Sequence, residues 1–71
     1  MSLYDPQHKE LVKKLKLSRE ESELSQEEVA KKINKTQSFI SKLETGQIKV
    51  DAILLDKLAK LYKKSINYFM E

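Results

Sequence analysis

Apolar residues recur at steps of three and four along most of this chain, which is the period of amphipathic α-helices. The first such stretch begins at Asp5-Pro6, where Asp can cap the free amides and Pro suits the first helical position, and it predicts a helix over about residues 6–22. Its inward stripe consists of Leu11, Val12, Leu15, Arg19 and Ser22. The other side carries Lys13, Lys14 and Lys16.

Start and stop signals then mark two short helices in close succession. Ser25 and Glu28 have the spacing of a capping box, which predicts a helix over residues 26–33. Asn34 follows as the turn residue, because Asn adopts positive φ more readily than other residues except Gly. Thr36 caps a third helix over residues 37–45, and Gly46 ends it. This is the layout of a helix-turn-helix, which presents its second helix to the DNA major groove.

Two further stretches complete the pattern. Asp51 caps a helix over residues 52–63, and Ser65 begins a short helix over residues 66–70. The apolar surface of the fourth helix comes from Ile53 or Leu54, Leu55, Leu58, Leu61 and Tyr62. No repeat, linker or low-complexity segment interrupts the pattern. We therefore expect an all-α fold of five helices in a single domain over residues 1–71, with the helix-turn-helix formed by helices 2 and 3.

The composition agrees with this pattern and limits the function. One Gly and one Pro argue against a turn-rich β fold, and the absence of Cys excludes disulfides and thiolate metal sites. The formal net charge of +3 permits a polyanionic partner without establishing one. No apolar run approaches the roughly 20 residues that span a membrane, and no stretch has the pattern of a signal-peptide h-region, so we expect a cytoplasmic protein. His8, the only histidine, is expected to be exposed and to bind no metal.

Several short motifs occur in order through the chain. They are Arg19, Leu24-Ser25-Gln26-Glu27-Glu28-Val29-Ala30, Thr36-Gln37-Ser38, Ile40-Ser41-Lys42-Leu43-Glu44, Gly46, Leu58-Ala59 and Ser65-Ile66-Asn67-Tyr68-Phe69. Together they resemble the lambda-repressor/Cro-type (XRE-like) helix-turn-helix family over about residues 9–70. The resemblance implies a compact five-helix lambda-repressor-like domain, a dimer-forming regulator and a third helix that reads operator DNA.

Two features depart from the family pattern. Asn34 stands where the family usually has Gly, and it tolerates the same conformation. An additional acidic stretch, Glu20-Glu21 and Glu23, must face away from DNA, because it would otherwise weaken binding.

Four residues of the third helix are candidates for contacts with DNA bases. Gln37 lies at the helix start, and its amide can both donate to and accept from adenine. Ser38 and Lys42 lie one turn apart on the same face, and Ser41 is the next candidate. For Gln37 the alternative is an exposed surface residue, and for Ser38 a serine that satisfies amides at the helix start. For Lys42 and Ser41 the alternative is a contact with the DNA backbone.

A second set of residues is placed to contact phosphates. Gln26 opens the second helix, where free amides favour an anion and where its side chain can brace Gln37. The other candidates are Lys35, Thr36, Gln47 and Lys49. For these residues the alternatives are a helix cap (Thr36) or solvated side chains. Phe39 either packs at the edge of the core or contacts a sugar or thymine methyl group.

Arg19 is the only arginine among fourteen basic residues. A guanidinium can hold a carboxylate with two hydrogen bonds, which lysine cannot. The family resemblance implies that Arg19 pairs with Glu44, between the first helix and the end of the third. The alternative is a local surface pair with Glu23.

These features predict a small transcriptional regulator of the repressor, controller or antitoxin type. It would bind double-stranded DNA at an inverted-repeat operator as a homodimer, without a cofactor or metal. The alternative is a helix-turn-helix scaffold that binds a partner protein. The C-terminal apolar residues either cap the core or form a two-fold interface; they are Tyr62, Ile66, Tyr68, Phe69 and Met70. An enzyme is the least supported class, because no nucleophile–base pair, phosphate-binding glycine loop or metal-ligand spacing occurs.

Overall fold

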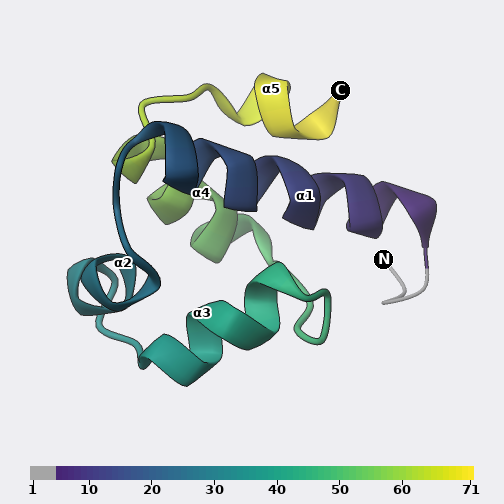
Figure 1. The fold of residues 1–71 in the computed structure, drawn as a ribbon. Helices are drawn as coiled ribbons and strands as arrows, with labels where there is room; N and C mark the ends of the chain where they lie inside the picture. The colour runs from purple at the N-terminus through teal and green to yellow at the C-terminus, as the bar shows by residue number, and fades with distance from the viewer. Residues whose placement is uncertain (1–4) are drawn as a thin grey trace.

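The computed structural model describes residues 5–71, and within this range it has five α-helices and no strand. The helices are α1 (Pro6–Glu21), α2 (Gln26–Lys32), α3 (Gln37–Glu44), α4 (Ala52–Leu61) and α5 (Ile66–Met70). Figure 1 shows α3 on one side of α1 and α5 on the other. The predicted all-α fold is confirmed. Helices α1 to α4 end one or two residues before the predicted positions.

Every helix begins at a polar side chain that accepts a hydrogen bond from a backbone amide of its first turn. In the capping box of α2, the Ser25 hydroxyl accepts from the Glu28 amide at 3.0 Å and the Glu28 carboxylate accepts from the Ser25 amide at 3.0 Å. The caps of the other four helices are Asp5, Thr36, Asp51 and Ser65. These bonds satisfy amides that have no partner within the helix.

Helices α1 to α4 also end alike, with a residue of positive φ two positions after the last helical residue. These residues are Glu23 (φ 59), Asn34 (φ 58), Gly46 (φ 83) and Lys63 (φ 58). In each case the next amide donates to the carbonyl five positions earlier, which is the Schellman arrangement. The predicted positive φ at Asn34 is therefore present. The reversal at Lys63 explains why α4 stops at Leu61 rather than continuing to residue 63.

The core lies where the inward faces of all five helices meet. Its buried apolar residues are Leu11, Leu15, Val29, Ala30, Ile33, Ile40, Leu43, Leu55, Leu58, Ala59, Tyr62 and Phe69. Of the two alternatives for the start of α4, Leu54 packs against this core and Ile53 is 71% exposed. At the C-terminus Phe69 and Tyr62 cap the core, whereas Ile66 and Met70 are exposed. Phe39 and Tyr68 pack at the edge of the core.

The inward face of α1 differs from the prediction at both ends. His8 is 1% exposed, so the expectation that it lies at the surface is wrong. His8, Leu11, Leu15 and Ser18 follow one another at three- and four-residue steps, and this spacing turns His8 inward with the leucines. Arg19 is only partly buried, and Ser18 beside it is fully buried. The His8 Nε2 and Ser18 Oγ atoms have no hydrogen-bond partner within residues 5–71.

Candidate nucleic-acid interface

Helix α3 has one buried side and one exposed side. Ile40 and Leu43 are 0% and 1% exposed and pack into the core, as the apolar period predicts. Gln37, Ser38 and Lys42 are exposed, and Ser41 is partly buried. Packing of α2 against α3 and the short turn between them hold α3 in this orientation. The four predicted base-contacting residues therefore share a helix whose outer side is open to a ligand.

The Glu44 carboxylate at the end of α3 points inward and binds Arg19 of α1. Arg19 Nε donates to Glu44 Oε2 at 2.7 Å, and Nη2 donates to Oε1 at 3.2 Å. The Arg19 side chain is 12% exposed and that of Glu44 is 3% exposed. The hydrogen bonding of the Arg19 guanidinium to the Glu44 carboxylate raises the pKa of Arg19. Arg19 also donates through Nη1 to the Leu24 carbonyl at 2.8 Å, so the guanidinium joins α1 to the segment that precedes α2.

This ion pair removes the negative charge of Glu44 from the exposed side of α3. Glu44 is the only acidic residue of the helix, and its side chain is withdrawn from solvent. The exposed side is left with neutral polar groups and the ammonium of Lys42. A surface of this kind suits a polyanion and does not repel it.

The expected bracing of Gln37 by the Gln26 side chain is not seen, because no hydrogen bond joins these two residues within the described part of the chain. The Gln26 Nε2 atom instead donates to Glu44 Oε1 at 3.0 Å. The side chain therefore belongs to the Arg19–Glu44 network, which joins α1, α2 and α3. Sequence reasoning missed this bond because the two residues are 18 positions apart and no local signal connects them.

The other predicted phosphate-contacting residues surround α3. Lys35, Thr36, Gln47 and Lys49 are all exposed. The Thr36 hydroxyl accepts from the Phe39 amide at 3.1 Å, so Thr36 is a helix cap. Lys35 Nζ lies 5.1 Å from the centroid of the Phe39 ring, a cation–π distance.

The acidic residues Glu20 and Glu21 of α1 lie away from the exposed side of α3. Glu21 Oε1 is 3.4 Å from Lys64 Nζ, beyond the end of α4. Glu20 lines a surface depression together with α1 residues such as Lys16 and Leu17. Neither carboxylate belongs to the exposed side of α3.

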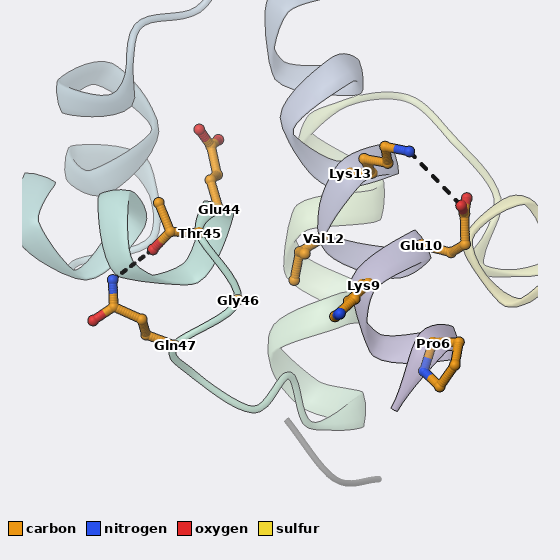
Figure 2. A pocket seen from close by; sticks show the side chains of 9 residues that line it. All are labelled: Pro6, Lys9, Glu10, Val12, Lys13, Glu44, Thr45, Gly46 and Gln47. Atoms are coloured by element: carbon orange, nitrogen blue, oxygen red, sulfur yellow. Dashed lines mark hydrogen bonds and ion pairs between the residues drawn. The ribbon is translucent and has the colours of Figure 1, made fainter. Parts of the chain in front are cut away.

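An open groove of about 830 Å³ lies between the first half of α1 and the C-terminal end of α3 (Figure 2). Of the predicted DNA-contacting residues only Gln47 lines it, and Gln47 Nε2 donates to Thr45 Oγ1 at 2.7 Å. On the other wall Lys13 Nζ is 3.9 Å from Glu10 Oε1. The groove is therefore separate from the exposed side of α3. A duplex takes a protruding helix into its major groove, so the convex side of α3 is the candidate interface.

Other kinds of site are not seen in the described part of the chain. Residues 5–71 contain no group of three or more His, Asp or Glu side chains placed to hold a metal ion. Within the same range no helix is long and apolar enough to cross a membrane.

Comparison with known proteins agrees with this geometry. A helix-turn-helix family model (HTH_3, the Cro/C1 type) matches residues 9–69. Neither the curated proteins nor the solved structures include a match to the chain. The family consists of DNA-binding regulators that are typically not enzymes. Since the match spans α2, α3 and most of the helices around them, the chain belongs to the Cro/C1-type helix-turn-helix family of DNA-binding regulators.

Proposed function

We propose that this chain is a sequence-specific transcriptional regulator that reads operator DNA with α3 in the major groove. The observation that carries the proposal is the inward turn of Glu44, which leaves the exposed side of α3 without a negative charge. An outward Glu44 would face the phosphates on both sides of the groove. Its pairing with Arg19 removes this repulsion.

Gln37 is the principal base-reading residue in this proposal. It is the first residue of α3 and is exposed, and residues at the start of a recognition helix reach base edges. Its amide can donate to and accept from adenine at the same time. Ser38, Ser41 and Lys42 supply further donors, and Lys42 suits guanine O6 or N7.

Phosphate contacts would come from residues on either side of α3. Lys35 precedes the helix and Lys49 lies in the loop after it, and both are exposed. Thr36 and Gln47 add neutral donors in the same two segments, and Gln26 stands at the start of α2. Such contacts fix the register of the protein on the duplex without reading its sequence.

We further propose that the regulator binds as a homodimer. Eight helical residues span about 12 Å, so a single α3 reads only a few base pairs. Two copies related by a two-fold axis would place their recognition helices about 34 Å apart, one turn of DNA. The operator would then be an inverted repeat. Control would come from protein concentration, dimerisation or a partner protein.

Selection of bound sequences from a random DNA pool tests the proposal. We expect an enriched inverted repeat whose half-sites are about one helical turn apart. Analytical ultracentrifugation with the enriched duplex should find two chains on each site. Equal retention of all sequences would reject specific reading. Absence of DNA binding would favour the alternative, in which the scaffold binds a partner protein.

A further inference from the structure

We infer that Glu44 is a positioning residue for DNA binding, because it holds the Gln26 amide at the start of α2 ready to donate to a phosphate. The inference rests on the proposed function. It goes further by linking a buried ion pair to DNA affinity through one neutral side chain.

The hydrogen-bond chemistry determines which way the Gln26 amide faces. Three donors converge on the Glu44 carboxylate: Arg19 Nε at 2.7 Å, Arg19 Nη2 at 3.2 Å and Gln26 Nε2 at 3.0 Å. An ionised carboxylate only accepts hydrogen bonds, so the NH₂ group of Gln26 must face it. One N–H bond of that group and the carbonyl oxygen are left without a partner within residues 5–71.

Gln26 is therefore already ordered in the free protein, unlike three of the other predicted contacts, Gln37, Lys42 and Lys49. Gln37, Lys42 and Lys49 are exposed, and their side chains form no hydrogen bond or ion pair within the described residues. Each of them loses rotamer freedom when it binds DNA, and this loss opposes binding. Gln26 loses much less, because Glu44 holds its amide before DNA arrives.

Because the Gln26 side chain is uncharged, its contact with a phosphate should depend on salt differently from a lysine contact. Each lysine that neutralises a phosphate releases a counterion, so its contribution weakens as salt rises. A neutral amide releases none. The Glu44 charge behind the amide is compensated by Arg19. The Gln26 contact should therefore contribute equally at low and high salt, whereas Lys49 should not.

Nuclear magnetic resonance of the unaltered protein tests the first half of the inference. The Gln26 side-chain NH₂ should show a ¹H–¹⁵N heteronuclear NOE close to that of the backbone amides. The Gln7 and Gln37 side chains, which are exposed, should show the low values of mobile groups. A Gln26 side chain as mobile as that of Gln7 would overturn the inference. No variant is needed, so the result does not depend on tolerance of substitutions.

Binding to the selected duplex tests the second half. Gln26→Met should weaken binding about tenfold on selected and unrelated sequences alike, with an unchanged salt slope. Glu44→Gln should weaken binding similarly, and adding Gln26→Met to it should change little further. Gln7→Met is the matched control and should bind as the unaltered protein does.

The outcomes separate the two proposals. If the unaltered protein enriches no sequence, the proposed function fails, whatever the state of Gln26. A second case is that the unaltered protein binds a selected site, but the losses of affinity caused by Gln26→Met and Glu44→Gln multiply in the double variant. That result, or an unchanged affinity of Gln26→Met, would mean that Glu44 does not act through Gln26. Circular dichroism at the binding temperature is the control that each variant is folded. Should Glu44→Gln prove unfolded, Arg19→Lys takes its place, since it also disturbs the carboxylate while preserving charge.

Discussion

Lys14 Nζ of α1 donates to the carbonyl oxygen of Tyr68 at 3.0 Å and lies 5.3 Å from the centroid of the same residue's ring. The same ammonium donates to the Glu71 carbonyl at 2.9 Å. Lys64 Nζ lies 4.9 Å from the Tyr68 ring. Lys14 therefore does not simply extend into solvent from the outer side of α1. Two lysines and the buried Phe69 hold the short helix α5 in place.

Substitution of Lys14 should loosen α5 without unfolding the rest of the protein. Lys14→Met keeps most of the aliphatic stem and removes the hydrogen bonds to the carbonyls of Tyr68 in α5 and of Glu71 directly after it. We expect hydrogen exchange of the α5 amides to accelerate about tenfold, while the α3 amides are unaffected. Lys13→Met is the control, because the Lys13 side chain is 79% exposed. Equal exchange in the two variants would mean that Lys14 does not hold α5.

The buried ion pair should matter far more to stability than an exposed one. Glu44→Ala leaves Arg19 with its charge uncompensated, and we expect a loss of about 3 kcal/mol in the free energy of unfolding. Glu10→Ala removes a pair with Lys13 whose side chains are 79% and 64% exposed, and it should change stability by less than about 0.5 kcal/mol. Urea denaturation followed by circular dichroism measures both. Similar losses would contradict the assignment of Arg19–Glu44 as a stabilising pair.

Removal of the buried Ser18 hydroxyl should stabilise the protein. The side chain is 0% exposed and its oxygen has no partner within residues 5–71, so folding removes a hydroxyl from water without replacing its hydrogen bond. We expect Ser18→Ala to add about 1 kcal/mol to the free energy of unfolding. Ser22→Ala is the control, because the Ser22 hydroxyl has a hydrogen-bond partner. Its hydroxyl donates to the Ser18 carbonyl at 2.8 Å, and its loss should not stabilise. A destabilised Ser18→Ala variant would show that the hydroxyl is satisfied in solution.

Tyr62 should make the protein sensitive to alkaline pH. Burial, and then the nearby Glu44 charge, raise the pKa of Tyr62 above that of a tyrosine in the unfolded chain, which is about 10. The folded state holds this proton more tightly, so the contribution of Tyr62 to stability is complete below pH about 10 and is lost as the pH rises further. Thermal unfolding of the unaltered protein and Tyr62→Phe across this range tests the effect. As the pH rises above about 10, the Tyr62→Phe variant should lose less stability than the unaltered protein. If the stability of both proteins falls in parallel with pH, Tyr62 is not the cause of the alkaline sensitivity.

Two substitutions at the proposed interface should affect DNA binding in different ways, one through base preference and the other through salt dependence. Gln37→Ala should cost about 1–3 kcal/mol on the selected site and relax the preference at one position of each half-site. Lys49→Ala should weaken binding to all sequences alike and reduce the salt slope by about one unit. Fluorescence anisotropy at several salt concentrations measures both. An unchanged base preference in Gln37→Ala would remove Gln37 as a base reader.

Much of this fold is determined by the sequence alone, because helix boundaries depend on short-range signals. Ser25 with Glu28 starts α2, and Asn34 ends it by adopting positive φ. Such caps and turns involve residues three to five positions apart, so they can be recognised without knowledge of the tertiary structure. The 3.6-residue period likewise identified the inward residues Ile40 and Leu43, and with them the side of α3 left exposed.

The tertiary structure decided what lies opposite each helix face. The period of α1 groups His8 and Ser18 with its leucines, but only packing shows that both are buried without hydrogen-bond partners. The hydrogen bond from Gln26 to Glu44 joins residues that are 18 positions apart. The hydrogen bonds from Lys14 to the carbonyls of Tyr68 and Glu71 join residues that are 54 and 57 positions apart. Contacts at such separations depend on how the helices cross, and the local pattern of the sequence carries no information about those angles.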